Sequence, residues 1–280
     1  MHTLSSSEKI LYAGPWVGEF GWELFCWQGH LRYLSTSYKK TVITCKKGHG
    51  CLYKDFAEVI ELNIPPLDAN MWNCHGFKFP SFRNIFGREL GPNKWIPPLS
   101  PIVRYDHMHK LDKESLFRMF SKQTFVKYGT LSKGYDILIH ARSKTNLVNN
   151  NVKSSYRNWH KVNWQRLADE FKDKNIACIG TKYEAEHIIG DDLRGISLSE
   201  LTNVLASSKV LVSPSSGPVH LAALCGCPHI TWFGDPYEVE NTIRFTTDWN
   251  PFGTKVDVVY DPKWNPTVKQ LKPLIEQNLL

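Results

Sequence analysis

Short runs of apolar residues alternate along the chain with glycine- or proline-marked loops and with amphipathic stretches. The clearest example spans residues 209–234. There, an apolar run at 210–212 predicts a buried strand, and Pro218 suits the first turn of a helix because its missing N–H would be unpaired there anyway. Gly226 marks the end of that helix, and a second apolar run follows at 229–233. The pattern predicts a right-handed strand–helix–strand unit.

The same alternation in the rest of the chain predicts an α/β protein. Expected strands are residues 9–13, 41–45, 135–141, 176–180 and 256–259; expected helices are 23–34, 111–128, 159–171 and 267–279. Residues 65–101 and the asparagine-rich 146–151 are expected to be irregular, and 129–134 to be a linker. We therefore expect an N-terminal Rossmann-like domain at 1–130, a second at 131–265, and a terminal helix at 266–280.

The loop at the start of the 218–224 helix consists of small residues. Ser216 and Gly217 leave the free N–H groups and the positive end of the helix dipole unobstructed, which favours an anion. Small residues at a helix start also serve simple chain reversal, so this pattern alone leaves both interpretations open.

The stretch around this loop resembles the signature of the heptosyltransferase-like glycosyltransferases, glycosyltransferase family 9. The matching residues are Ser216, Gly217, Pro218, His220, Leu221, Ala222, Ala223, Pro228, Phe233 and Gly234. The resemblance covers residues 135–234 well and the N-terminal half thinly. One departure is Ser215, where the family usually carries an acidic residue.

The resemblance implies a GT-B fold, in which two Rossmann-like domains face each other across a cleft. It also implies an inverting transfer of a sugar from a nucleotide-sugar donor, which acts as a co-substrate, with no cofactor and no metal. The C-terminal domain would bind the donor and the N-terminal one the acceptor, and in such a fold the terminal helix at 266–280 would pack back on the N-terminal domain. Donor contacts are then expected from the loop and helix residues Ser215, Ser216, Gly217, Pro218 and His220.

Charged residues after two expected strands extend this donor set. Arg142 and Lys144 follow the strand at 135–141, at the edge where open α/β sheets bind ligands, and could neutralise a departing diphosphate. Lys182 and Glu184 follow the next strand and are weaker candidates for nucleotide contacts. Solvated surface charges would show the same pattern.

Two glutamates near the N-terminus are candidates for the catalytic base. Gly18-Glu19 occupies the place of the Gly-Asp pair whose carboxylate is the family's presumed base. Glu23, at the expected start of a helix, is the alternative, although an acidic residue is favoured there by the helix dipole in any case.

The net charge of +7 and an aromatic content of 12% suggest an anionic partner. Trp72, Arg83, Arg88 and Lys94 interleave aromatic and basic character in the irregular segment, where they could contact an acceptor or form a satellite core. We expect, as a narrow hypothesis, a hydroxymethylated base in viral DNA as the acceptor. A lipopolysaccharide core sugar or another glycan is the alternative that the resemblance favours.

The remaining sequence features bear on compartment and class. Seven cysteines, an odd number without zinc spacing, predict reduced thiols in a cytoplasmic protein. The first residues lack the apolar core of a signal peptide, and no run is long enough for membrane insertion. A non-catalytic sugar-nucleotide or nucleic-acid binding module and a sugar-nucleotide epimerase remain alternatives, and the sequence leaves the oligomeric state open.

Overall fold

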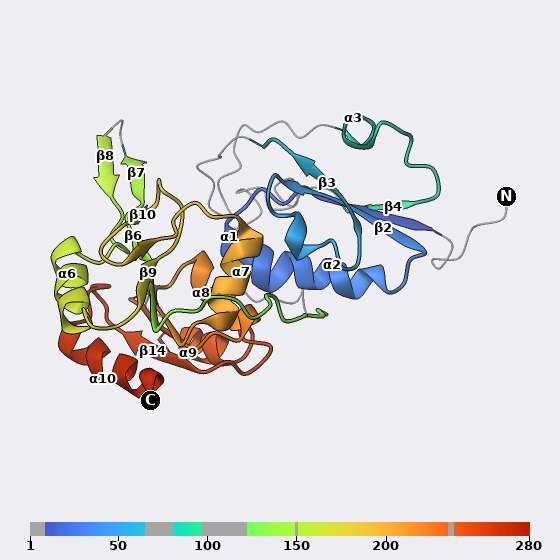
Figure 1. Ribbon diagram of the computed structural model, residues 1–280. Helices are drawn as coiled ribbons and strands as arrows, with labels where there is room; N and C mark the ends of the chain where they lie inside the picture. Colours follow the sequence, from blue (N-terminus) through green and yellow to red (C-terminus); the bar gives the residue numbers. More distant parts are fainter. Residues whose placement is uncertain (1–8, 65–80, 97–121, 149–150, 235–237) are drawn as a thin grey trace. The chain divides into compact units, whose positions relative to one another are not determined.

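A computed structural model describes residues 9–64, 81–96, 122–148, 151–234 and 238–280 (Figure 1). Contacts divide the chain into two compact units, Met1–Phe125 and Val126–Leu280. Trp72 lies outside the described residues, as does most of the helix expected at 111–128. The part of that segment that is described, residues 122–128, is not helical.

The first unit contains a four-stranded parallel sheet in the order β3-β2-β1-β4. Its strands are β1 (Ile10–Ala13), β2 (Lys40–Lys46), β3 (Glu58–Leu62) and β4 (Lys94–Ile96). Between β1 and β2 the chain forms a continuous helical stretch of α1 (Phe20–Trp22), η2 (Glu23–Trp27) and α2 (Gln28–Ser35), where η2 is a π-helical segment. A 3-10 turn, η3 (Gly50–Leu52), follows β2.

The segment expected to be irregular contributes to this sheet. It contains the short helix α3 (Phe82–Phe86) and strand β4, which pairs with β1. Phe82 is buried against Tyr12 of β1, with ring centroids 4.9 Å apart. Several of its aromatic residues therefore form a small core, one of the two alternatives that the sequence left open.

The second unit contains a six-stranded parallel sheet in the order β11-β9-β5-β12-β13-β14. Its strands are β5 (Ile137–Ile139), β9 (Ile176–Cys178), β11 (Asp191–Asp192), β12 (Val210–Pro214), β13 (His229–Phe233) and β14 (Val256–Tyr260). Successive strands extend outward from β5 on one side and from β12 on the other. In open α/β sheets ligands bind beyond the carboxyl ends of the strands at such a switch point, which here lies between β5 and β12.

Helices α6 (Lys161–Glu170), α7 (Leu198–Ser207), α8 (Gly217–Cys225), α9 (Glu238–Thr246) and α10 (Val268–Leu279) complete this unit (Figure 1). Trp159, Trp164 and Trp232 pack together in its core, with ring centroids 4.8–5.7 Å apart. Leu271 and Ile275 of α10 are fully buried in the same core. The terminal helix, expected on the N-terminal domain, thus buries its apolar face within the second unit.

The strand–helix–strand unit around α8 matches the sequence prediction closely. Strand β12 includes the predicted run, α8 begins at Gly217 with Pro218 in its first turn, and β13 covers the predicted 229–233. The helix ends at Gly226, whose φ of 75° is the left-handed conformation that glycine adopts most readily.

The asparagine-rich stretch after β5 was expected to be an irregular loop, and the structure forms a hairpin there. Strands β7 (Thr145–Val148) and β8 (Asn151–Ser154) pair antiparallel. Two short strands, β6 (Ala141–Arg142) and β10 (Ala185–Glu186), pair beside it. Across the described residues, no helix combines the length and apolar character that crossing a bilayer requires.

Candidate functional site

A hydrogen-bonded histidine and two serines occupy the switch point of the second sheet. His140 directly follows β5, Ser213 lies near the end of β12, and Ser216 is the N-cap of α8. His140 Nδ1 lies 3.0 Å from Ser213 Oγ and 3.1 Å from Ser216 Oγ, and the two hydroxyl oxygens are 3.0 Å apart. The carboxyl ends of β5 and β12 are thus joined by side chains at the start of α8.

The arrangement of hydrogens in this group follows from the contact of Ser213 with the main chain. Its hydroxyl donates to the Pro214 carbonyl oxygen at 2.8 Å, so the Ser213 oxygen is left to accept a hydrogen bond from His140 Nδ1 or from Ser216. Burial, with a smaller contribution from Arg142, lowers the pKa of His140 to about 3. The imidazole is therefore neutral at physiological pH, and the Ser216 hydroxyl can donate to His140, to Ser213 or to a bound oxygen.

Arg157 brings a positive charge to the same loop. Its guanidinium donates to the Ser215 carbonyl oxygen and lies 4.9 Å from the ring centroid of Trp264. Trp264 is buried and has a φ of 55°, a strained conformation for an aromatic residue. Arg157 Nε is buried without a hydrogen-bond partner in the described part of the chain. The loop before α8 therefore combines a fixed cation with the positive end of the helix dipole.

Sequence reasoning identified neither Arg157 nor His140. The motif around Ser216 could not indicate them, because Arg157 is 58 residues and His140 76 residues away from their partners in that loop. The position of His140 at the end of an apolar run was the available signal for that residue.

The predicted cations Arg142 and Lys144 lie beside the switch point. Arg142 Nη1 donates to Asn158 Oδ1 at 2.6 Å, and Asn158 Nδ2 donates to the Lys144 carbonyl oxygen at 2.7 Å. Lys144 also forms an ion pair with Glu184 at 3.3 Å. Arg142 lines a hollow of about 470 Å³ bordered by the ends of the hairpin and the start of α6.

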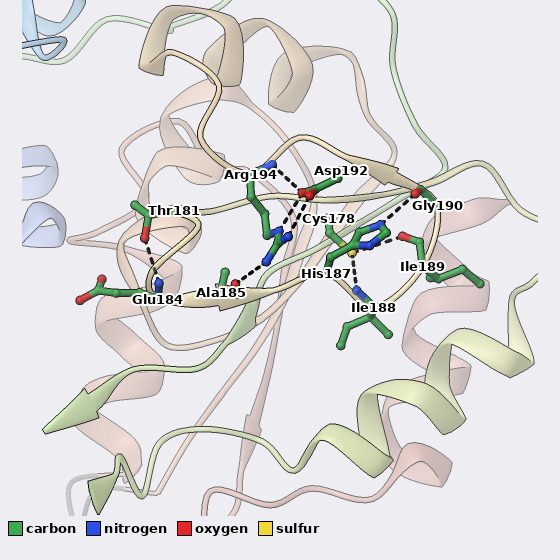
Figure 2. Close-up of polar contacts among 10 residues, drawn as sticks. All are labelled: Cys178, Thr181, Glu184, Ala185, His187, Ile188, Ile189, Gly190, Asp192 and Arg194. Carbon is green, nitrogen blue, oxygen red and sulfur yellow. Dashed lines mark hydrogen bonds and ion pairs between the residues drawn. The ribbon is translucent and has the colours of Figure 1, made fainter. Parts of the chain in front are cut away.

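Residues 178–194 contain several separate sets of polar contacts, and in one of them Glu184 N donates to Thr181 Oγ1 at 3.1 Å (Figure 2). Arg194 Nε and Nη2 donate to the two carboxylate oxygens of Asp192, and Arg194 Nη1 donates to the Ala185 carbonyl oxygen at 2.9 Å. The Arg194 guanidinium holds the pKa of Asp192 well below its usual range. These contacts fix the turn that carries Glu184 and the exposed Lys182.

Two other predicted donor residues lie on α8 itself. Pro218 is in its first turn. His220 is on the buried face of the helix, 5.7 Å from the Phe245 ring and 5.2 Å from the Trp249 ring between centroids. Burial lowers the pKa of His220 to about 3. The structure therefore places His220 in an aromatic core, whereas Ser215, Ser216 and Gly217 form the loop.

In the first unit, Gly18 and Glu19 follow the carboxyl end of β1, at the start of α1. Trp16 Nε1 donates to the Glu19 carbonyl oxygen at 3.0 Å, and a Cβ on Gly18 would lie 2.8 Å from the Trp16 ring. Glycine at position 18 therefore gives the tryptophan room. Among the described residues, the Glu19 carboxylate has no hydrogen-bond or ion-pair partner.

Glu23 has a very different environment. Its side chain is fully buried and accepts hydrogen bonds from Tyr53 at 2.7 Å and from His49 Nδ1 at 2.8 Å. A carboxylate enclosed in this way cannot itself contact an acceptor. The prediction that Glu23 takes part in catalysis therefore remains a prediction, with its carboxylate enclosed by Tyr53 and His49 in this structure.

Of the predicted acceptor set, Gly18 is next to Glu19, whereas Arg83 belongs to α3, Arg88 follows that helix and Lys94 belongs to β4. Arg83 is exposed and pairs with Glu89 at 3.3 Å. Arg88 donates to the Tyr12 hydroxyl at 3.3 Å, and Lys94 begins β4. Because β1 and β4 are parallel, Lys94 is at the amino-terminal edge of the sheet, whereas Gly18 and Glu19 follow its carboxyl edge.

The whole chain is similar to solved glycosyltransferase structures. It aligns with E. coli heptosyltransferase WaaC with ADP over 96% of this chain and 99% of that one, with 15% identity and a TM-score of 0.57. The chain has the fold of the heptosyltransferases. E. coli ADP-heptose lps heptosyltransferase II aligns over 97% and 98%, with 12% identity and a TM-score of 0.57. The glycosyl transferase family 9 structure from Veillonella parvula aligns over 98% of both chains, with 11% identity and a TM-score of 0.58.

This likeness to the heptosyltransferases confirms the α/β GT-B fold expected from the sequence. At these identities it establishes the fold alone. No family model matches the chain, and no curated protein sequence matches it.

Proposed function

We propose that the protein is a glycosyltransferase that takes a sugar from a nucleotide-sugar donor bound to its second unit. The observation that carries this proposal is the position of the Ser215–Gly217 loop. It lies at the switch point of the sheet, with His140 and Arg157 beside it, in a chain with the heptosyltransferase fold. The structural neighbours include one with ADP and one with ADP-2-deoxy-2-fluoro heptose.

The donor diphosphate would lie at the start of α8. The free N–H groups there and the Ser216 hydroxyl donate to phosphate oxygens, while Arg157 and Arg142 supply positive charge. As the bond between the sugar and the diphosphate breaks, negative charge accumulates on the leaving oxygen, and these groups stabilise it. Cations and N–H groups can do this without a metal ion, so we propose a metal-independent transfer.

The first unit would bind the molecule that receives the sugar. It would also supply the base that takes the proton from that molecule's hydroxyl group. A single displacement by that hydroxyl inverts the anomeric carbon. The candidates for this step are Glu19, which follows β1, and the pair of Glu23 in η2 with His49 after β2.

We propose a carbohydrate acceptor, as in the neighbour whose title names lps. A nucleic-acid acceptor was the narrower expectation from the basic segment, but Arg83 and Arg88 already have protein partners and Lys94 lies at the amino-terminal sheet edge. Two results together would restore DNA as the acceptor. The logarithm of the binding constant for duplex DNA would fall with the logarithm of the salt concentration, with a slope of about −0.9 per phosphate contact. The protein would also incorporate sugar into hydroxymethylated DNA.

The test is release of nucleoside diphosphate from a panel of ADP-, GDP- and UDP-sugars, measured with and without EDTA. The proposal predicts release from at least one sugar in both conditions, increased by a lipopolysaccharide core oligosaccharide. A binding module would shift the melting temperature without release, and an epimerase would convert the sugar without release. Either result would contradict the proposal.

A further inference from the structure

A buried carboxylate and a histidine are paired in the first unit, beyond the carboxyl ends of β1 and β2. Glu23 Oε2 lies 2.8 Å from His49 Nδ1, and Glu23 Oε1 accepts a hydrogen bond of 2.7 Å from the Tyr53 hydroxyl. Glu23 is fully buried. An ionised carboxylate only accepts hydrogen bonds, so the Nδ1 atom of His49 carries a hydrogen and the Nε2 atom of the neutral ring carries the lone pair.

His49 itself is accessible. Its side chain is 22% exposed, and the ring of Phe20 packs edge-on against it at 5.4 Å between centroids. Among the described residues, His49 Nε2 has no hydrogen-bond partner. The imidazole is thus held at one nitrogen by a buried acid, while its other nitrogen is left for a proton from outside.

The main chain fixes both members of the pair. Glu23 opens the π-helical segment η2, and such turns are rare and often occur at functional sites. The loop of His49 is held from both sides, because Gly48 N and Gly50 N donate to the two carboxylate oxygens of Glu61 at 3.0 and 3.1 Å. The orientation of the ring is therefore set before any ligand binds, which favours a group acting in a transition state.

We propose that His49 is the proton acceptor of the transfer reaction and that Glu23 orients it, an inference that rests on the proposed function. As the acceptor oxygen bonds to the anomeric carbon, its proton passes to His49 Nε2. The bond from that carbon to the diphosphate oxygen breaks, and its electron pair leaves with the diphosphate. The resulting imidazolium is stabilised by the Glu23 carboxylate, whose role is positioning and charge compensation.

Competing groups at this place are less suited to the step. The Glu19 carboxylate lacks a partner among the described residues that would hold it in one orientation. Burial raises the pKa of Cys45 to about 12 and that of Cys51 to about 11, so both thiols near Glu23 stay protonated. In the described part of the chain, no group of three or more His, Cys, Asp or Glu side chains is placed to hold a metal ion.

The central variant is His49→Asn, because an asparagine amide nitrogen can replace Nδ1 as the donor to Glu23 while the Nε2 lone pair is lost. The matched control is His30→Asn in the same unit, where a partly buried histidine Nδ1 contacts the Lys122 carbonyl oxygen at 3.3 Å. Turnover is measured as nucleoside diphosphate release from the sugar of the ADP-, GDP- and UDP-sugar panel that wild type consumes, and donor affinity by calorimetry.

We expect His49→Asn to lose about 100-fold or more in turnover, the range for removing a general base, with unchanged donor affinity. His30→Asn should retain wild-type turnover. Added imidazole should restore activity to His49→Ala, with rates that follow the basicity of substituted imidazoles. Glu23→Gln should lower kcat while KM for the donor stays constant, which a purely structural role would not produce.

Near-normal turnover of His49→Asn together with an inactive Glu19→Gln would overturn the inference and make Glu19 the base. Loss of donor affinity in His49→Asn, or no imidazole rescue of His49→Ala, would likewise overturn it by assigning His49 a structural role. If wild type releases no nucleoside diphosphate from any sugar, the proposed function itself fails and this inference falls with it.

Discussion

Replacing Arg157 with lysine tests the donor site at its most specific contact. The guanidinium donates to the Ser215 carbonyl oxygen while it lies 4.9 Å from the Trp264 ring centroid, so its planar group is held between the loop and the aromatic ring. Lysine keeps the charge but has no planar fork with which to bond the loop and a phosphate oxygen at once.

The expected cost follows from these contacts. Losing one hydrogen bond to a charged group costs about 1.5–3 kcal/mol, which corresponds to a decrease in donor affinity of about 10- to 100-fold. Arg157→Ala also removes the positive charge that lysine keeps, and should therefore bind the donor more weakly still.

The assay is isothermal titration calorimetry with the nucleotide-sugar that wild type consumes. Arg166→Lys is the matched control, since Arg166 is an exposed residue of α6 in the same unit. Wild-type donor affinity in both Arg157 variants, with an unchanged melting temperature, would show that Arg157 does not contact the donor.

Three further outcomes are expected from the second unit. Gly180→Ala should lower turnover and stability, because its φ is 119° and a Cβ would lie 2.7 Å from His140 Cδ2; wild-type kinetics would show that His140 can shift freely. Arg142→Ala should weaken donor binding by about 1.5–3 kcal/mol in calorimetry, and an unchanged affinity would exclude a direct contact. Burial lowers the pKa of His140 and His220 to about 3 and that of His229 to about 4. Histidine in an unfolded chain has a pKa of about 6.5, so between these pH values the unfolded state binds more protons than the folded state. Urea denaturation should therefore show stability falling as the pH drops from about 6 to 4, by about 1.4 kcal/mol per pH unit for each histidine, and a flat profile would contradict their burial as neutral rings.

The α8 unit could be predicted closely from sequence because every signal in it is local. An apolar run, a proline in the first helical turn and a glycine at the helix end each act within a few residues. The β7–β8 hairpin was missed because asparagines favour turns and mask a short strand pair. Strand β4 was missed because its three residues become a strand only by pairing with β1, more than 80 residues earlier.

In the candidate site, too, local features could be predicted from the sequence and long-range contacts could not. Ser216 and Gly217 belong to a contiguous motif and could be identified, whereas the contacts of His140 and Arg157 with that loop depend on tertiary folding. Glu23 was considered for direct proton transfer, but its burial and its bond to His49, 26 residues away, carry no local signature. Sequence patterns thus indicated the chemistry of the loop, and the structure supplied the side chains around it.

Calorimetric titration of the donor nucleotide-sugar into wild type and Gly217→Val tests whether the diphosphate binds at the start of α8. Valine at the first residue of α8 would place a branched side chain where the diphosphate approaches the main chain. We expect measurable binding by wild type and a loss of donor affinity of at least about tenfold in the variant, with the melting temperature of the free protein retained. Equal affinities in the two proteins would contradict binding of the diphosphate at the start of α8 and would place the nucleotide elsewhere.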